Sequence, residues 1–134
     1  MSRLAPRFCL NILIDNRCEN HIYMYMEITS TQFCIGQVVR HRHYSFRGVI
    51  VDVDPEFSNT EEWWNAIPEE VRPRKDQPFY HLLAENEETT YMAYVSEQNL
   101  LIDETGEPVN HPQVSEVFGE FLGDSYAVPV SYRN

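Results

Sequence analysis

The alternation of apolar and polar residues between positions 36 and 102 predicts a series of short β-strands. In the clearest of them, residues 47–54, Val49, Val51 and Val53 occupy every second position and would share one face. Four other segments combine aromatic and β-branched residues with turn-forming residues at their ends. They are residues 37–42, 79–85, 90–95 and 100–102. Strands this short, in this number, favour a mainly β chain folded as a small antiparallel barrel.

Between residues 54 and 79 the period-two pattern stops, and the sequence predicts a short helix followed by an extended loop. Ser58 and Glu61 match a capping box and place a helix over residues 59–66. Three prolines in residues 68–78 cannot continue a helix, so a long Pro-rich loop should lead to the next strand. Loops of this kind in compact domains are often functional.

Two terminal segments flank the patterned region. Residues 1–32 show no clear period, and we expect a disordered extension or a misassigned start, with Met24 or Met26 as the true first residue. Residues 104–134 are acidic and should form a flexible tail. Within this tail, five apolar residues follow the spacing of a short amphipathic helix: Val114, Val117, Phe118, Phe121 and Leu122. The predicted domain therefore spans residues 33–103.

The chain is strongly acidic, with 21 Asp and Glu against 10 Lys and Arg and a formal net charge of −11. Such a field opposes non-specific binding to nucleic acid, which depends on neutralising phosphates. Six of the ten cations nevertheless fall within residues 33–101: Arg40, Arg42, Arg47, Arg72, Arg74 and Lys75. They can form a local site for phosphate or an acidic peptide, or pair with nearby carboxylates, and the sequence leaves both interpretations open.

The cysteines and the hydropathy pattern bear on the cellular setting. Cys9, Cys18 and Cys34 form neither a CxxC pair nor a zinc-binding spacing, so we expect free thiols in a reducing compartment. No segment approaches the roughly 20 apolar residues needed to span a membrane. No cleavage site of a signal peptide follows the short apolar run near the N-terminus. We therefore expect a cytoplasmic protein with no membrane partner.

Histidines and carboxylates are the candidates for metal or acid–base chemistry. His41 and His43 lie two apart on a predicted strand and could bind zinc or copper with His81 or Asp52 as third ligand. Neighbouring arginines oppose a bound cation there. The alternating carboxylates of residues 52–56 lack an accompanying nucleophile motif, and pairing with arginines is their simpler interpretation. We expect no catalytic residue, no metal and no cofactor.

Trp63 and Trp64 fall on the predicted helix and cannot both point inward from one helical turn. One of them should anchor the helix on the sheet, leaving the other partly exposed. An exposed Trp beside basic residues can stack on a base or seat a protein partner.

Several segments, taken together and in order, resemble one known family. They are Ile35-Gly36-Gln37-Val38-Val39-Arg40-His41, Gly48-Val49-Ile50-Val51-Asp52-Val53-Asp54-Pro55, Pro78-Phe79-Tyr80-His81 and Tyr94-Val95-Ser96-Glu97-Gln98-Asn99-Leu100. Over residues 33–103 the chain resembles the heat shock protein HspQ family, also called the YccV-like or hemimethylated-DNA-binding domain. The resemblance implies a non-enzymatic, cytoplasmic, SH3-like β-barrel that self-associates. It also implies two activities: preferential binding of hemimethylated DNA, and promotion of the degradation of denatured proteins by the Lon protease in heat stress.

The DNA-binding activity would need a local reader of the methylated base. Recognition of an adenine edge calls for an Asn or Gln, and Gln77 beside Arg74 and Lys75 is the candidate. Together with the other four cations named above, these residues form the candidate DNA-binding set.

An adaptor would instead need a docking surface for unfolded chains or for the protease. Trp63, Trp64 and the apolar residues of 114–122 are the candidates for this surface. Because a chain of net charge −11 is poorly suited to tight DNA binding, we rank the protease adaptor first. Binding of hemimethylated DNA, linked to control of replication initiation, comes second, and a metal hydrolase using His41, His43 and His81 comes third.

Overall fold

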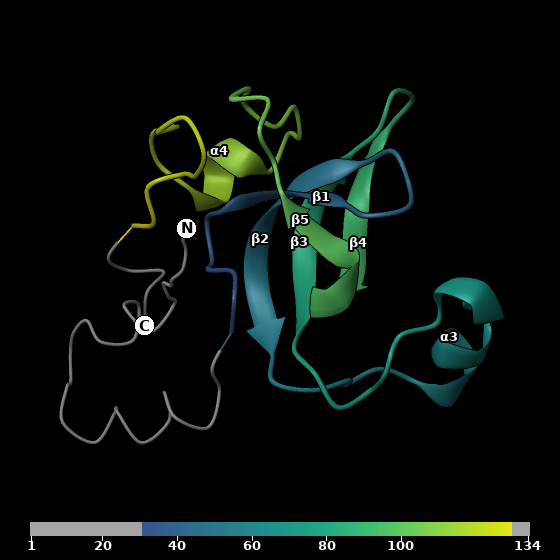
Figure 1. The fold of residues 1–134 in the computed structure, drawn as a ribbon. Helices are drawn as coiled ribbons and strands as arrows, with labels where there is room; N and C mark the ends of the chain where they lie inside the picture. Colours follow the sequence, from purple (N-terminus) through teal and green to yellow (C-terminus); the bar gives the residue numbers. More distant parts are fainter. Residues whose placement is uncertain (1–30, 130–134) are drawn as a thin grey trace, which may run out of the picture.

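A single antiparallel sheet organises the fold in the computed structural model, which describes residues 31–129 (Figure 1). Its strands are β1 (Val38–His41), β2 (Arg47–Asp54), β3 (Phe79–Glu85), β4 (Thr90–Ser96) and β5 (Leu100–Ile102). The order across the sheet is β4-β3-β2-β1-β5, and every neighbouring pair is antiparallel. The mainly β fold predicted from the sequence is confirmed.

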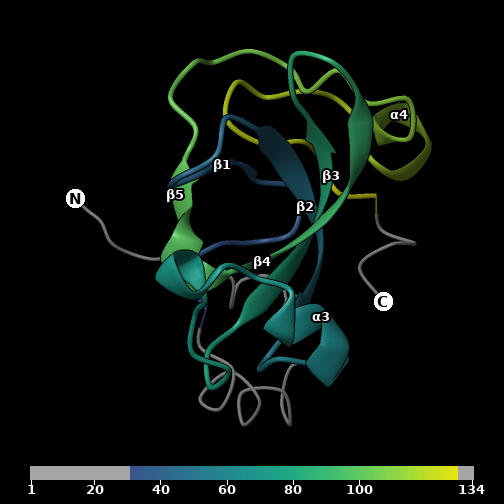
Figure 2. The same ribbon diagram turned by 90° about the vertical axis from the view of Figure 1, so that its right-hand side faces the viewer.

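The sheet curls into a barrel-like shape that does not close, with β4 and β5 as its two edges (Figure 2). A single 3-10 turn, η2 (Glu97–Asn99), joins these two edge strands. The concave side surrounds a first core cluster in which Ile50, Tyr80 and Leu82 are completely buried. The Tyr80 hydroxyl donates a hydrogen bond to Glu97 at 2.7 Å, which ties the interior to this turn.

A β-bulge in β2 determines which side chains reach each side of the sheet. The register with β3 shifts between Ile50 and Asp52, which leaves Val51 as the extra residue. Val49 and Val51 consequently pack in a second core cluster on the convex side, whereas Val53 packs against the first cluster. The prediction that the three valines share one face is therefore wrong for Val53, because the added residue reverses the alternation.

The segment that follows β5 packs over the convex side of the sheet (Figure 1). Four of its side chains complete the second core cluster: Val109, Val114, Phe118 and Tyr126. Only Val114–Val117 is helical, as α4, because the backbone becomes extended at Phe118. A backbone bridge between Gln37 and Ser125 then fixes the segment beside β1. The described part of the expected flexible tail is thus packed against the sheet, and the helix predicted over 114–122 ends at Val117.

The connection between β2 and β3 carries two short helical segments, α3 (Glu61–Asn65) and η1 (Glu69–Val71). The helix was predicted here, but its N-cap is Thr60 rather than Ser58. The Thr60 Oγ1 accepts a hydrogen bond from the backbone N–H of Trp63 at 3.0 Å. This cap satisfies one of the amide groups that a helix leaves unpaired at its start.

Cys34 is disulfide-bonded, so the expectation of a free thiol is wrong at this position. Cys9 and Cys18 lie outside the described residues, as does the predicted extension up to residue 30. Within residues 31–129, no helix has the length and apolar character needed to cross a membrane.

Candidate binding surfaces

An apolar groove of about 240 Å³ lies between β4, the α3 loop and the β1–β2 connection. Aromatic and aliphatic side chains form most of its lining, chiefly Tyr44, Phe46, Trp63, Ile67, Tyr91 and Tyr94. Since β4 is an edge strand of the sheet, one side of its backbone has no neighbouring strand among residues 31–129. Ser96 also lines the groove, and its buried Oγ has no hydrogen-bond partner among residues 31–129. The groove therefore combines apolar walls with a strand edge.

The tryptophans of α3 hold this helix over the end of the sheet. Trp63 packs edge-on against Tyr94, with ring centroids 5.3 Å apart, and Trp64 packs against Phe57 at 5.5 Å. Both indoles are partly buried. Trp63 lines the groove, whereas Trp64 lies beside Lys75, whose Nζ is 5.0 Å from the ring centre. Both therefore anchor α3, and Trp63 is the one placed to touch a ligand in the groove.

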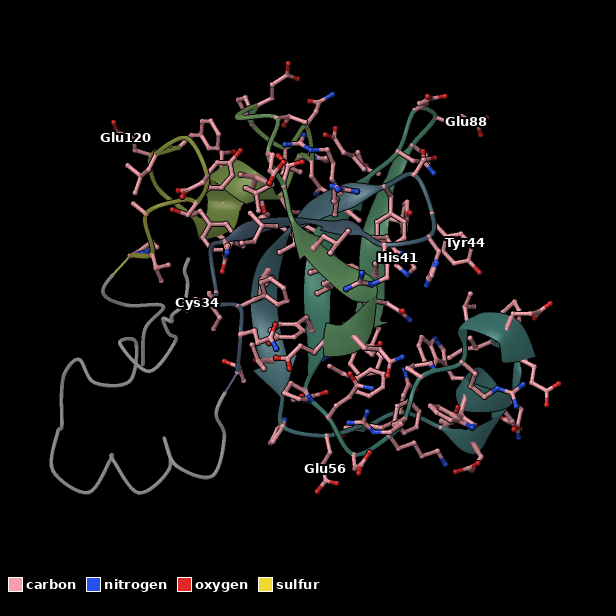
Figure 3. All side chains as sticks on the ribbon, in the orientation of Figure 1. Cys34, His41, Tyr44, Glu56, Glu88 and Glu120 are labelled. Atoms are coloured by element: carbon pink, nitrogen blue, oxygen red, sulfur yellow. The ribbon has the colours of Figure 1, made fainter. Side chains whose placement is uncertain are left out.

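His41 shapes the opposite wall of the groove, where it lies against Tyr44 (Figure 3). Its Nδ1 accepts hydrogen bonds from the backbone N–H groups of His43 at 2.9 Å and Tyr44 at 3.0 Å. Burial, followed by the charges of His43 and Arg42, lowers the pKa of His41 to about 4. Within the described part of the chain, neither His41 nor His43 belongs to a three-ligand group. His41 therefore holds the backbone of the connection that follows β1.

Arg47 forms ion pairs with two carboxylates inside the domain. Its guanidinium pairs with Glu85 at 2.7 Å and with Asp103 at 3.0 Å. Burial opposes its charge, but hydrogen bonds and charges from Asp103 and Glu85 raise the pKa of Arg47 above its ordinary value. It also donates to the backbone oxygens of Glu107 and Pro108. Arg47 thus fastens the C-terminal segment to the sheet and is not available for the predicted contact with DNA.

Gln77 is buried, and both ends of its amide are already hydrogen-bonded. The Nε2 group donates to the Arg74 backbone oxygen at 2.9 Å and to Gln98 Oε1 at 2.6 Å. The Oε1 atom accepts from the Gln98 backbone N–H at 2.9 Å. In this structure the amide joins the Pro-rich loop to η2, and the reading of an adenine edge by Gln77 stays a prediction.

Three further candidate cations in the Pro-rich loop have partners within the domain. Arg72 donates to the backbone oxygen of Ile67 at 2.9 Å, close after α3. Arg74 forms an exposed ion pair with Asp76 at 2.9 Å. Lys75 forms an ion pair with Glu61 of α3. Arg74 and Lys75 are therefore paired with carboxylates, whereas Arg72 is held by backbone oxygens and keeps its charge.

Arg40 and Arg42 are the two candidate DNA-binding cations that are exposed and form no ion pair among residues 31–129. Both are exposed at the β1 end of the domain. Arg42 donates from Nε to the backbone oxygen of Gln98 at 2.9 Å, and its Nη groups make no hydrogen bond among residues 31–129. Arg40 borders a second pocket, of about 390 Å³, together with Tyr44 and Glu87. A contact with phosphate would be centred on these two arginines.

The apolar C-terminal residues that were candidates for partner binding mostly serve the second core cluster. Val114 and Phe118 are buried, and Val117 and Phe121 pack against the same cluster. Leu122 alone among the five is exposed, at 58%. Most of this apolar stripe thus covers the convex side of the sheet, and partner binding by these residues stays a prediction.

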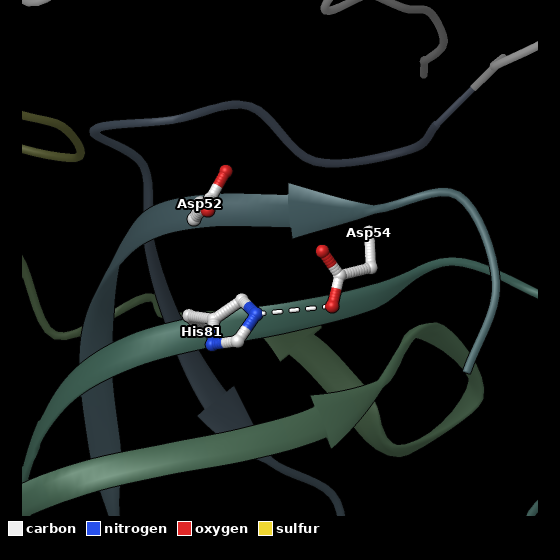
Figure 4. Close-up of side chains that lie close together, drawn as sticks. All are labelled: Asp52, Asp54 and His81. Carbon is white, nitrogen blue, oxygen red and sulfur yellow. Dashed lines mark hydrogen bonds and ion pairs between the residues drawn. The ribbon is translucent and has the colours of Figure 1, made fainter. Parts of the chain in front are cut away.

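A histidine and two aspartates meet on the convex side of the sheet near α3 (Figure 4). Asp52 lies directly opposite His81 across the β2–β3 pair, and Asp54 follows two residues later. One ligand-type atom from each lies within 4.8 Å of the others, and no other such group occurs among residues 31–129. The Asp54 Oδ2 is 3.1 Å from His81 Nε2 and accepts a hydrogen bond from the Tyr94 hydroxyl at 2.8 Å.

The groove itself was missed from the sequence. Tyr91, Ala93 and Val95 alternate along the predicted strand 90–95, and this alternation is the signal for one wall of the groove. Tyr44, which is 48% exposed, falls between the predicted strands 37–42 and 47–54. Another wall comes from Ile67, which precedes Tyr91 by about 25 residues in the chain, and no local pattern predicts that the two lie close together.

The fold and its surfaces define a small, open β-barrel domain. A family model described as "Hemimethylated DNA-binding protein YccV like" matches residues 31–125, so the chain belongs to the YccV-like family. The match confirms the resemblance stated above. It also extends past residue 103 to Ser125, in agreement with the packing of the C-terminal segment on the sheet.

Curated relatives include F-box only protein 21 from mouse, which is 32% identical over 95 residues, and from human, which is 30% identical over 95 residues. The matched region covers 70% of this chain but 15% of each relative. The chain thus corresponds to a small part of these larger proteins. No solved structure matches the chain.

Proposed function

We propose that this protein is a non-enzymatic, stress-linked adaptor that promotes degradation of denatured proteins by an ATP-dependent protease of the Lon type. The observation that carries the proposal is the apolar groove beside the open edge of β4. A denatured protein differs from a folded one in presenting apolar side chains and unpaired backbone groups together. The groove lining can contact the apolar side chains, and the edge of β4 can pair with the backbone groups.

Binding of an extended segment along β4 would use a known mode of peptide recognition. An edge strand supplies unpaired backbone groups to a peptide that adds to the sheet, and pockets beside it accept alternate side chains. Tyr91 and Ala93 project from β4 into the groove, and Trp63 lies across from them.

The charge of the domain supports a polypeptide over a polyanion as the principal ligand. Residues 31–129 contain six basic and eighteen acidic side chains, a formal net charge of −12. Several of the basic side chains are paired within the fold, as described above. Unfolded segments that carry basic residues beside apolar ones would be attracted, while phosphates would be repelled except near Arg40 and Arg42.

The test is degradation of a denatured model substrate by purified Lon protease, with and without the full chain. The groove variants Ile67→Ser and Tyr44→Ser should reduce the stimulation several-fold. Leu122→Ser is the matched control, because this side chain is 58% exposed and lies outside both the groove lining and β4. The proposal fails if the wild-type chain gives no stimulation, and the groove assignment fails if all three folded variants stimulate equally.

Binding of hemimethylated DNA is the second candidate, supported by the description of the family model and by the exposure of Arg40 and Arg42. It is tested by fluorescence anisotropy with one duplex in hemimethylated, fully methylated and unmethylated forms, at low and physiological salt. Arg40→Ala with Arg42→Ala should weaken hemimethylated binding and lower its salt dependence. Arg74→Ala, which removes an exposed and already paired cation, is the control. Equal affinity for the three duplexes would exclude a methylation-specific role.

In this proposal the protein acts in the cytoplasm and self-associates. Self-association would bring two grooves into one particle and increase the effective affinity for long unfolded chains. Analytical ultracentrifugation over a range of protein concentrations measures it. A single monomer mass throughout that range would remove this part of the proposal.

A further inference from the structure

We propose that Asp52, Asp54 and His81 form a binding site for one first-row divalent transition-metal ion of the zinc type. This inference concerns the convex side of the sheet and does not depend on the adaptor function. It departs from the sequence-based expectation of no metal, because the three residues come together only in the folded sheet (Figure 4).

The backbone of two paired strands places the three ligands. Asp52 and Asp54 are two residues apart in β2, so their side chains share one side of the sheet. The bulge at Val51 shifts the register so that Asp52, and not Val51, lies opposite His81. Their ligand atoms already lie within 4.8 Å of one another. Zinc bonds to nitrogen and oxygen are about 2.0–2.2 Å long, so metal binding requires the exposed Asp52 side chain to rotate toward the other two. Its Oδ1 accepts a hydrogen bond from the Val53 backbone N–H at 2.9 Å, which leaves Oδ2 as the free donor atom.

The electrostatics of this cluster favour a cation. Asp52 and Asp54 bring two carboxylates together, and among residues 31–129 no Lys or Arg forms an ion pair with either. His81 is the one basic group at Asp54, at 3.1 Å. A bound divalent ion would relieve the repulsion between the two carboxylates and replace the single hydrogen bond that His81 makes there.

The donor set indicates the class of metal. Two carboxylate oxygens with one imidazole nitrogen suit zinc, cobalt and ferrous iron, whereas magnesium and calcium prefer sites made entirely of oxygen. Three protein ligands on an accessible face leave the remaining positions to water or to another ligand. His81 would offer the Nε2 lone pair, with its proton held on Nδ1.

A neighbouring tyrosine orients one of the ligands. The Tyr94 hydroxyl donates to Asp54 Oδ2 at 2.8 Å and accepts from the Ser58 backbone N–H at 2.9 Å. Hydrogen bonds of this kind position metal-binding carboxylates and strengthen binding. Because Tyr94 also lines the groove, the metal ligands and the groove share one side chain.

The experiment is a titration of the full chain with Co²⁺, followed by absorption spectroscopy and by competition with Zn²⁺. We expect one Co²⁺ per chain, visible d–d bands, displacement by Zn²⁺ and none by millimolar Mg²⁺. The sulfur-to-metal charge-transfer band should be absent, which excludes binding at the cysteines. His81→Gln and Asp52→Asn should each weaken the Co²⁺ affinity at least about tenfold. Because the Asp52 side chain is exposed, Asp52→Asn should leave the fold intact.

His43→Gln and Asp76→Asn are the matched controls, because each removes a ligand-type side chain outside the cluster. Both should bind Co²⁺ with wild-type affinity. Absence of saturable binding, a sulfur charge-transfer band, or unchanged affinity in both Asp52→Asn and His81→Gln would overturn the proposal.

Discussion

Arg47 on β2 and Asp103 after β5 form an ion pair with an Nη2–Oδ2 distance of 3.0 Å, in which the Asp103 side chain is only 2% exposed. The pair joins a central strand to the start of the C-terminal segment. Thr105 donates a second hydrogen bond to the same carboxylate oxygen at 2.7 Å. Arg47, a candidate DNA-binding residue from the sequence, therefore links β2 to the C-terminal segment.

Replacing Arg47 with Ala should lower the free energy of unfolding by about 3 kcal/mol. Removing one partner of a buried ion pair leaves the other charge without compensation, and here Asp103 would remain in an almost fully buried position. Urea denaturation followed by tryptophan fluorescence measures the change.

Arg74→Ala is the control for this substitution. It breaks an ion pair whose two side chains are 68% and 79% exposed, and such pairs contribute at most about 1 kcal/mol. Equal losses of stability in the two variants would contradict the structural role given to Arg47.

Stability should fall as the pH is lowered from about 6.5 toward 4 because of His41. Burial holds the pKa of this imidazole at about 4, whereas the unfolded chain binds the proton with the ordinary pKa near 6.5. The unfolded state therefore takes up more protons in this window, so the stabilisation is complete above pH 6.5 and is lost on acidification. A loss of about 2 kcal/mol is expected, after allowance for solvent screening.

His41→Asn tests this assignment, because its Oδ1 can accept the same backbone hydrogen bonds without titrating. Denaturation curves at several pH values should show a shallower dependence in this variant between pH 6.5 and 4. An NMR titration that places the His41 pKa near 6.5 in the folded protein would rule the explanation out.

The local patterns predicted the strands well, because strand alternation is a property of neighbouring residues. The predicted segments 47–54, 79–85 and 100–102 coincide with β2, β3 and β5. The bulge after Ile50 was not predictable, since it depends on register with β3. The faces assigned to the β2 side chains were consequently wrong beyond that point.

The candidate site was less predictable because its parts meet only through long-range packing. Gln77 looked suitable as a base reader in a basic run, but its amide is fixed by Gln98 across the fold. The meeting of Asp54 with His81 likewise required the pairing of β2 with β3. The sequence therefore shows which residue types are present, but it does not show which side chains are free to contact a ligand.

Gly48→Ala should destabilise the protein by about 1–3 kcal/mol. A Cβ at this position would lie 2.6 Å from the backbone oxygen of Leu83 and 3.0 Å from the Ala84 Cα, so paired strands would have to separate. Gly119→Ala is the control, since its nearest contact would be 3.4 Å from the Ala127 Cβ. Thermal unfolding compares the two, and a Tm of Gly48→Ala equal to that of the wild type would contradict the close approach of β2 and β3.

Phe118→Ala should cost about 3 kcal/mol, because Phe118 is 5% exposed within the second core cluster and its loss leaves a cavity against the sheet. Leu122→Ala removes a side chain of similar apolar character that is 58% exposed, and it should change stability by less than about 0.5 kcal/mol. Urea denaturation distinguishes a packed segment from a flexible tail, since a tail would give small effects for both. A small effect of Phe118→Ala would return the boundary of the stable domain to about residue 103. A large one would mean that partner binding by residues 114–122 requires the segment to leave the sheet, which makes the groove beside β4 the more accessible docking surface.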